Sequence, residues 1–213
     1  MAMRPVFVPG KRKNEADVYM TELQWNSGLS VSQKRKNINA LHEAHRRRFP
    51  ESKVLEISSK SENPLGVALS AFNLKMAVPG LEQRVPLECV FQGGKVFSAG
   101  GPYTDLYNGT ARDAKRDPRL KSSGMMKEFW FDGKSFPLVP RTAFYNWLYV
   151  NALVENPQLA EELIQYDGFT DIEFNPDKSM NCQAEAAALY VTLARKNLLE
   201  RCRSFEDFLE LIR

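Results

Sequence analysis

The chain has 213 residues, 43% of them hydrophobic, and a formal net charge of +3. This length suits one domain with a sizeable core, and the apolar content excludes a disordered chain. The charge is too small to indicate nucleic-acid binding by itself. No apolar run is long enough for a membrane span, and the N-terminus lacks the apolar core of a signal peptide. Three scattered cysteines and two histidines favour neither a disulfide framework nor a zinc site, so we expect a cytoplasmic protein without a metal cofactor.

The first 18 residues are predicted to form a basic, irregular arm, because Pro5, Pro9 and Gly10 interrupt any regular element. No internal repeat and no low-complexity linker divides the rest of the chain. We therefore expect one catalytic domain over residues 19–213.

The first half of this domain is predicted to contain two helices and two strands. Ser32 suits the N-cap of a helix that runs to about Phe49. Strands are predicted over Val54–Ile57 and Leu69–Val78, and a helix over Pro86–Phe97, which a proline opens.

The second half is predicted to be mostly helical. The Asp132-Gly133 pair between two apolar runs indicates a β-hairpin, and alternating apolar and acidic residues predict a strand over Phe169–Phe174. Capping residues and apolar spacing predict further helices over Thr142–Val154, Pro157–Gln165, Gln183–Leu198 and after Ser204. The aromatic residues of the first of these helices, Tyr145 among them, are expected in the core. The predicted fold class is α+β: a helix-dominated single domain with a small antiparallel sheet and a hairpin.

The most informative segment is Pro86–Phe97. Leu87, Val90 and Phe91 recur at helical spacing and are expected to face a core. Glu88 lies in the same first turn, where burying a carboxylate is costly without a partner or a purpose. A glutamate at a helix N-terminus is also favoured by the helix dipole, so its role is either structural or chemical.

Two glycines, Gly93 and Gly94, lie inside this predicted helix. Each costs about 1 kcal/mol relative to alanine in a helix interior. They are expected where another backbone or a ligand approaches closely. They are not a phosphate-binding loop, because the Gly-x-Gly-x-x-Gly pattern is absent.

Residues 88–97, Glu-Cys-Val-Phe-Gln-Gly-Gly-Lys-Val-Phe, resemble the Glu-x-x-Phe-Gln-x-x-Lys-Phe signature of the NADAR superfamily, the NAD- and ADP-ribose-associated N-glycosidases. The resemblance extends over roughly residues 54–197. Four further segments resemble family segments in the same order: Leu69–Asn73, Thr110–Arg116, Asn156–Leu163 and Asn181–Arg195.

One family element differs here. The Asp-x-x-Trp-Gly element that usually precedes the last helix is replaced by Asn175-Pro-Asp-Lys-Ser-Met-Asn-Cys-Gln183, and the glycine of the closing helix is also replaced. Together with Gly101-Pro-Tyr-Thr-Asp105, this form resembles the NADAR proteins paired with DarT-type toxins, which are guanine-directed DNA ADP-ribosyltransferases.

The resemblance implies an N-glycosidase that removes ADP-ribose from modified guanine in single-stranded DNA or in a nucleoside. It also implies an antitoxin role against a cognate DNA ADP-ribosyltransferase, with no cofactor. Two alternatives stay open: a riboflavin-pathway enzyme that cleaves a ribosylamine phosphate, and a non-catalytic module that binds ADP-ribose or single-stranded DNA.

Three residues are candidates for the chemistry. Glu88 can stabilise the oxocarbenium-like charge at ribose C1, position water and shuttle a proton. Lys95, seven residues on and expected on the same helical face, can form a Schiff base with the opened ribose. Its alternatives are a phosphate contact or a solvated surface role. Lys60, ahead of the Phe72 segment, is the second candidate lysine.

Substrate contacts are expected from polar and aromatic side chains near the signature. An amide can bond ribose hydroxyls, an aromatic ring can stack on a base, and a carboxylate can accept from an exocyclic amine. Strand packing and an ordinary Gly-Pro turn are the structural alternatives. The candidates are Ser70, Phe72, Asn73, Gln92, Tyr103 and Asp105.

Basic residues form a cluster over 112–119, with Arg112 and Arg116 as the main candidates. They suit a diphosphate or a DNA backbone, although a charge run is also typical of a solvated face. Basic residues at 34–36 and 46–48 flank the first helix, where they can follow a single strand with Trp25 as a stacking platform.

Two carboxylates, Asp171 and Glu173, are expected on one face of their predicted strand and can divide acid and base roles. Asn175, Ser179 and Asn181 follow at a helix start, where free N–H groups suit phosphate or ribose.

Overall fold

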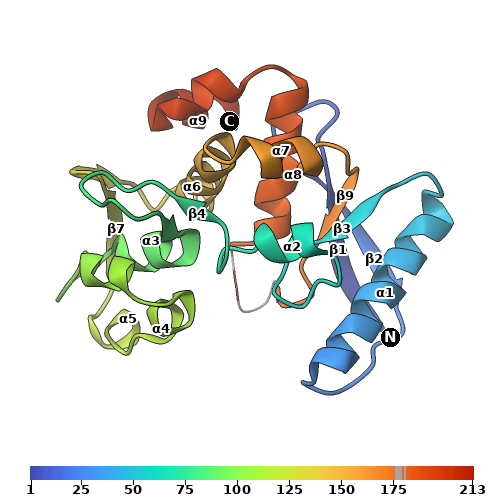
Figure 1. The fold of residues 1–213 in the computed structure, drawn as a ribbon. Helices are drawn as coiled ribbons and strands as arrows, with labels where there is room; N and C mark the ends of the chain where they lie inside the picture. The colour runs from blue at the N-terminus through green and yellow to red at the C-terminus, as the bar shows by residue number, and fades with distance from the viewer. Residues whose placement is uncertain (176–178, 180) are drawn as a thin grey trace.

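The computed structural model describes residues 1–175, 179 and 181–213 (Figure 1). The helices are α1 (Val31–Arg48), α2 (Pro64–Ala68), α3 (Leu87–Gly93), α4 (Ala111–Arg116), α5 (Arg119–Ser122), α6 (Ala143–Val154), α7 (Pro157–Leu163), α8 (Gln183–Arg195) and α9 (Phe205–Leu211), with 3₁₀ turns at Thr104–Asn108 and Leu199–Arg203. The strands are β1 (Ala2–Val8), β2 (Asp17–Leu23), β3 (Val54–Glu56), β4 (Lys75–Met76), β5 (Val85–Pro86), β6 (Lys95–Phe97), β7 (Met126–Phe131), β8 (Lys134–Phe136) and β9 (Gly168–Thr170).

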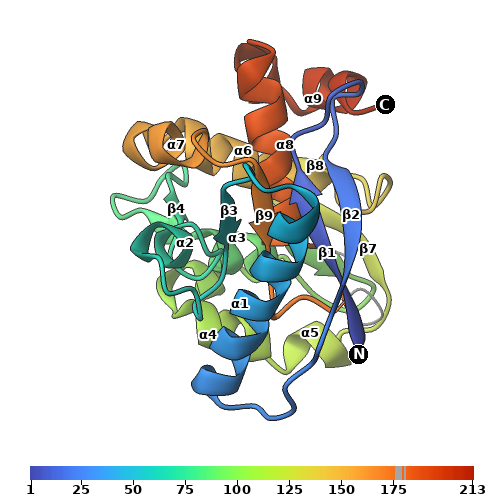
Figure 2. The same cartoon turned by 90° about the vertical axis from the view of Figure 1, so that its right-hand side faces the viewer.

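A four-stranded sheet with the order β2-β1-β9-β3 forms one side of the molecule (Figure 2). β1 is antiparallel to both neighbours, whereas β3 and β9 are parallel. α1 covers one face, where Val6, Leu23 and Leu41 form a small apolar cluster. Because side chains alternate along a strand, Phe7 points to the opposite face, and with Phe169 it joins the main core against α8.

The N-terminal segment is therefore not the irregular arm predicted from its prolines and glycine. Residues 2–8 form β1, which β2 and β9 enclose. Pro5 is compatible with this strand because β9 pairs with β1 at Phe7, so Pro5 lies outside that pairing. Gly10 follows the strand, and its N–H donates to Thr192 Oγ1 at 2.8 Å, which ties the turn to α8.

The core is built around α6, which is buried along both sides as its aromatic sequence predicts. Phe144 stacks on Phe129 of β7 with 4.5 Å between ring centroids. Trp147 Nε1 donates to the Cys202 carbonyl at 2.9 Å, so the buried indole keeps a hydrogen-bond partner. The ring stack holds the three-stranded sheet β6-β7-β8 against the central helix, and the indole hydrogen bond ties the 3₁₀ turn at Leu199–Arg203 to it.

The hairpin predicted at Asp132-Gly133 is confirmed. Both residues have positive φ, 48° and 73°, and they join β7 to β8 through the Phe131–Lys134 pair. A two-residue loop of this kind matches the right-handed twist of the strands it connects.

The helix that contains Glu88 is shorter than predicted. It ends at Gly93, with Gly94 as its C-cap, and Lys95 begins β6. The Gly94 carbonyl accepts from Trp130 N–H at 2.6 Å, so the chain joins the sheet here instead of continuing the helix. Lys95 therefore does not lie two helical turns after Glu88.

Three further predictions about local structure are corrected. Leu69–Val78 is not a strand, since α2 ends at Ala68 and a turn leads to the two-residue β4. β9 ends at Thr170, so Asp171 and Glu173 lie in a turn instead of on one strand face. Ser30, not Ser32, caps α1 and accepts from the Gln33 N–H.

The fold class is α+β, as predicted from the alternation of helical and strand patterns. Its sheets are small, and the largest includes one parallel pair. None of the helices in the described part of the chain is long and apolar enough to cross a membrane.

Candidate functional site

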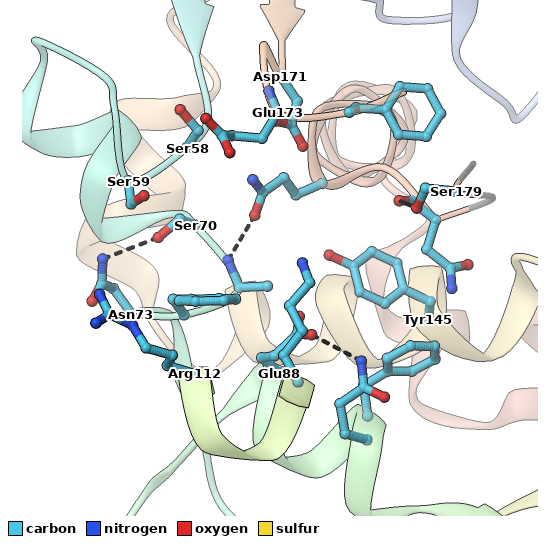
Figure 3. Close-up of a pocket in the computed structure, with 18 of the residues that line it drawn as sticks. Ser58, Ser59, Ser70, Asn73, Glu88, Arg112, Tyr145, Asp171, Glu173 and Ser179 are labelled. Atoms are coloured by element: carbon cyan, nitrogen blue, oxygen red, sulfur yellow. Dashed lines mark hydrogen bonds between the residues drawn. The ribbon is translucent and has the colours of Figure 1, made fainter. Parts of the chain in front are cut away.

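A cavity of about 960 Å³ lies where the four-stranded sheet and α2 face α3 and α4 (Figure 3). Glu88 and Arg112 lie below the open space in this view, and Asp171 and Glu173 lie above it. The lining comes from the segment after β3, the turn after α2, the helices α3, α4 and α6, the start of β6, the chain between β9 and α8, and the first residue of α8. Its residues are Ser58, Ser59, Lys60, Ser70, Ala71, Phe72, Asn73, Glu88, Phe91, Gln92, Lys95, Arg112, Lys115, Arg116, Tyr145, Asp171, Glu173, Phe174, Ser179, Asn181 and Gln183.

The floor of the cavity is a hydrogen-bonded row of three side chains. Gln92 Nε2 donates to Glu88 Oε1 at 2.9 Å, and Lys95 Nζ donates to Gln92 Oε1 at 2.7 Å. The first pair is four residues apart on α3, and the bend at the C-terminus of α3 brings the lysine back to the same amide. The predicted proximity of Glu88 and Lys95 is thus reached by a different path.

Glu88 is 6% exposed and faces the cavity without an ion-pair contact within 4.0 Å among the described residues. Its position in the first turn of α3 favours the negative charge, because the helix dipole places partial positive charge at the N-terminus of a helix. Its backbone N–H donates to the Ala71 carbonyl at 2.9 Å, which fixes the start of α3 against the turn after α2. The carboxylate is therefore held rigidly at the cavity floor.

Lys95 has an environment that weakens its positive charge. Burial lowers the pKa of its amine to about 8, the nearby Glu88 opposes that shift, and Lys115 adds to it. Its Nζ also lies 4.7 Å from the centroid of the Phe91 ring. A lysine with such a pKa has a substantial neutral fraction near pH 8 and can act as a nucleophile.

The turn after α2 forms one side of the cavity. The sequence pattern predicted a strand for these residues. Asn73 Nδ2 donates to Ser70 Oγ at 3.0 Å and to the Val67 carbonyl at 2.9 Å, so the amide nitrogen is used within the turn. Phe72 lies with its ring 5.3 Å from Lys115 Nζ and borders the cavity. Lys60 is also in the lining, where its Nζ donates to Ser59 Oγ at 2.8 Å.

The basic side of the cavity is α4. Arg112, Lys115 and Arg116 all line the cavity, and all three are exposed. Thr110 caps this helix by accepting from the Asp113 N–H. The helix therefore presents cations to a ligand, while an N–H group at its N-terminus is hydrogen-bonded within the chain.

The acidic side is the turn between β9 and α8. Asp171 Oδ1 accepts from the Glu173 N–H at 3.0 Å, and the side chain of Gln183 also donates to Asp171. Burial raises the pKa of Asp171, and the negative charge of Glu56 raises it further. Glu173 pairs with Lys34 of α1 at 2.5 Å.

Two further residues of this segment, Ser179 and Asn181, are in the lining, and Asn181 Oδ1 is buried without a hydrogen-bond partner among the described residues. The other residues of the Asn175–Gln183 segment at positions 176–178 and 180 lie outside the described residues. Asn175 precedes this part, and its carbonyl accepts from the Ser179 N–H at 2.9 Å, but it is not in the cavity lining.

Tyr103 and Asp105, predicted to contact substrate, lie away from the cavity lining. Arg119 lies 4.4 Å over the Tyr103 ring and pairs with Asp105 at 2.7 Å. It also pairs with Asp117 at 2.8 Å. The Gly-Pro loop and Arg119 therefore stabilise each other in this structure.

The sequence alone did not single out several lining residues. Tyr145 was assigned to the core, and it is buried, but it also borders the cavity. Gln183 lies at the start of α8, and its Oε1 accepts from the Ala71 N–H at 2.8 Å. The position of Gln183 at the end of the divergent Asn175–Gln183 segment is the one signal that points to it.

Among the residues that the structure describes, no group of three or more His, Cys, Asp or Glu side chains is arranged to hold a metal ion. The cavity instead offers carboxylates, an amine, amides and a basic helix. These groups suit the binding of a polar, anionic ligand and acid–base chemistry within it.

A family model described as DarT1-associated NADAR antitoxin matches residues 2–213. The chain belongs to this family. The match of the NADAR antitoxin model extends from β1 to α9, and so it includes β1, β2 and α1, which precede the part of the chain that carries the superfamily resemblance. No curated protein matches the chain.

Proposed function

We propose that this protein is an N-glycosidase that removes ADP-ribose from modified guanine in DNA and so acts as the antitoxin of a DarT1-type DNA ADP-ribosyltransferase. The family described as DarT1-associated antitoxins supports the biological role. The observation that carries the chemistry is the buried carboxylate of Glu88, linked through Gln92 to a lysine of lowered pKa at the floor of the cavity.

The cavity suits this substrate in size and charge. Its volume of about 960 Å³ lies near the upper end of the range for ligand sites, about 300–1,000 Å³. Arg112, Lys115 and Arg116 supply positive charge for a diphosphate, since guanidinium and ammonium groups bind phosphate oxygens strongly. Phe72 and Tyr145 supply apolar surface for a ribose or a base.

Glu88 has the role of stabilising charge at ribose C1. Breaking the C1–N bond leaves an oxocarbenium-like centre, and an adjacent carboxylate stabilises that charge or takes a proton from the attacking water. Lys95 is close enough to share an amide with Glu88, so its neutral amine can approach the same carbon after the ring opens. Lys60 is a less suitable nucleophile, because its amine donates to Ser59 Oγ, whereas Lys95 is linked to Glu88 through Gln92.

The test is an incubation of the protein with an oligonucleotide that carries one ADP-ribosylated guanine. Mass spectrometry should show the unmodified oligonucleotide and free ADP-ribose, released in many equivalents per protein molecule. Protection without release would support the non-catalytic binding module instead. Release from a ribosylamine phosphate, with the oligonucleotide left intact, would support the riboflavin-pathway alternative.

A further inference from the structure

A buried carboxylate, Glu56, lies directly behind the acidic side of the cavity. It is 2% exposed and is the last residue of β3, beside Thr170 in the parallel pair with β9. Its Oε2 accepts from Thr170 Oγ1 at 2.6 Å, its Oε1 accepts from the Ile172 N–H at 2.9 Å, and Ser58 donates to it as well. These three donors stabilise the ionised form of Glu56.

A histidine extends this network away from the cavity. His42 Nε2 lies 2.8 Å from Thr170 Oγ1. Because the Thr170 proton is directed to Glu56, the network assigns the proton between His42 and Thr170 to the histidine nitrogen. Burial, together with the positive charge of Arg46 and with His45, lowers the pKa of His42 to about 4, so this ring is a neutral donor at pH 7.

Asp171, which lines the cavity, is the neighbour of this buried charge. Burial and the charge of Glu56 both raise the pKa of Asp171, and desolvation raises that of Glu56. Asp171 accepts hydrogen bonds from the Glu173 N–H and from Gln183, one donor fewer than Glu56 accepts. Two adjacent carboxylates in such a site share one proton, and the group with fewer donors keeps it.

The other charged and titratable groups around Asp171 do not reverse this assignment. Glu173 adds negative charge from the same turn and is itself paired with Lys34 of α1. Tyr145 and Tyr149 of α6 and Cys182 before α8 have pKa values raised by burial, with Asp171 adding to each shift, so all three are neutral at pH 7.

A chain of hydrogen bonds connects Asp171 to the cavity floor. Gln183 donates to Asp171 and accepts from the Ala71 N–H at 2.8 Å, while the Ala71 carbonyl accepts from the Glu88 N–H at 2.9 Å. Figure 3 shows Asp171 and Glu88 on opposite sides of the open space. A substrate between them would have one carboxyl group on each side of the bond to be cleaved.

We propose that Asp171 is the acid that protonates the departing base, and that Glu56 is a positioning residue that keeps the proton on Asp171. This inference rests on the proposed N-glycosidase function. The C1–N bond breaks, both of its electrons leave with the nitrogen, and the proton of Asp171 neutralises the released base. In the route without a Lys95 adduct, water adds its oxygen to C1 and gives its proton to Glu88. Exchange with solvent then returns a proton to Asp171 and removes one from Glu88.

The first experiment compares the pH dependence of kcat for the wild type, Asp171→Asn and Glu56→Gln on the modified oligonucleotide. Asp171→Asn should lower kcat by about 10²–10⁴-fold with little change in substrate binding, the usual range for loss of an acid–base group. Glu56→Gln removes the charge that opposes ionisation of Asp171, so the alkaline limb of the profile should move to lower pH by roughly one unit or more. Asp167→Asn changes a half-buried carboxylate that pairs with Arg195 outside the cavity lining, so it is the control and should leave the profile unchanged.

A purely structural role for Glu56 predicts a lower kcat at every pH with the alkaline limb in its original place, and that result would overturn the proposal. Thr170→Val is a second variant in case Glu56→Gln fails to fold. It removes one donor from Glu56, so it should move the limb in the same direction by a smaller amount, whereas Thr170→Ser should not.

A readout that does not depend on turnover separates this inference from the proposed function. With ¹³C-labelled aspartate, the carboxyl signal that disappears in Asp171→Asn should titrate well above the usual aspartate range in the wild type, and lower in Glu56→Gln. Titration of that signal within the usual aspartate range would overturn the proposal that Asp171 keeps the proton shared with Glu56. Absence of turnover in the wild type, with the raised titration present, would instead overturn the N-glycosidase function.

Discussion

Glu88 and Lys95 bind opposite ends of one side-chain amide, that of Gln92, at 2.9 Å and 2.7 Å. The amide fixes its own orientation, because its nitrogen must face the carboxylate and its oxygen must face the ammonium group. An anion and a cation are thereby held near each other without a direct salt bridge. Each keeps its remaining hydrogen-bonding capacity for a ligand in the cavity.

The first prediction concerns this carboxylate. Glu88→Gln keeps the size of the side chain and removes its charge, so turnover of the ADP-ribosylated oligonucleotide should fall by about 10²–10⁴-fold. Binding of ADP-ribose, measured by calorimetry, should change little, because the basic residues of α4 are intact. Glu82→Gln, an exposed residue in the loop before β5, is the control. Near-normal turnover in Glu88→Gln would exclude this residue from the chemistry.

The second prediction concerns the amine of Lys95. If a Schiff base forms with the ribose, borohydride added during turnover should leave an adduct of ADP-ribose mass on Lys95. Below its pKa, an amine gains neutral fraction about tenfold for each unit by which the pH increases. Burial lowers the pKa of Lys95 to about 8. The initial rate of adduct formation should therefore increase from about pH 6 to about pH 8.

Peptide mapping and two variants decide between the candidate lysines. Lys95→Arg should abolish the adduct, whereas Lys60→Arg should retain it. An adduct mapped to Lys60 would contradict the assignment from the geometry. Active turnover with no adduct in any variant would indicate direct attack by water.

The sequence singled out Glu88 and Gln92 of α3 as site candidates, but it assigned Phe91 to the core and did not predict how the chain brings Lys95 to them. Glu88 and Gln92 are four residues apart on one helix, so local periodicity is sufficient to place them together. The bend at Gly93 and Gly94 depends on the pairing of β6 with β7, which is a contact between segments about thirty residues apart. Periodicity within one segment contains no information about such a contact.

The same limit explains the other differences in the site. Gln183 acts through the backbone of Ala71, more than a hundred residues away, and Glu56 acts through Thr170. Tyr103 and Asp105 were predicted to contact substrate from the chemistry of a Gly-Pro loop, yet Arg119 engages both of them. Residue type indicates what a side chain can bind, whereas the fold decides which partner is within reach.

The third prediction concerns the two glycines at the end of α3. Their expected close contacts are confirmed, since a Cβ on Gly94 would lie 2.6 Å from the Trp130 carbonyl oxygen, and one on Gly93 would lie 2.6 Å from the Tyr107 ring. The Trp130 atom is backbone and cannot rotate away. Gly94→Ala should therefore lower the free energy of unfolding by about 1–3 kcal/mol, measured by urea denaturation.

Gly109→Ala is the matched control for this change. Its φ is −96°, and the nearest atom to an added Cβ is 3.5 Å away, which is ordinary contact. Its stability should stay within about 0.5 kcal/mol of the wild type. Equal stability of Gly94→Ala and Gly109→Ala would show that β6 and β7 can separate at this point without cost.

The last prediction concerns the size of the substrate. If the exposed cations of α4 contact nucleic-acid phosphates as well as the diphosphate, the modified oligonucleotide should bind more tightly than the modified nucleoside. The logarithm of its affinity should fall linearly with the logarithm of salt concentration, by about 0.7 for each phosphate contact on a single strand. Arg112→Glu with Arg116→Glu should flatten that slope by about 1.4 if each residue makes one such contact.

The control is Lys121→Glu with Lys127→Glu, which changes the net charge equally at exposed positions outside the cavity lining. Arg119 is left intact in both variants, because its pairs with Asp105 and Asp117 give it a structural role. The difference between the two double variants therefore isolates local phosphate contacts from the general effect of net charge. Equal slopes for oligonucleotide and nucleoside in the wild type would mean that α4 contacts only the ADP-ribose, and that the protein recognises a modified base without its DNA strand.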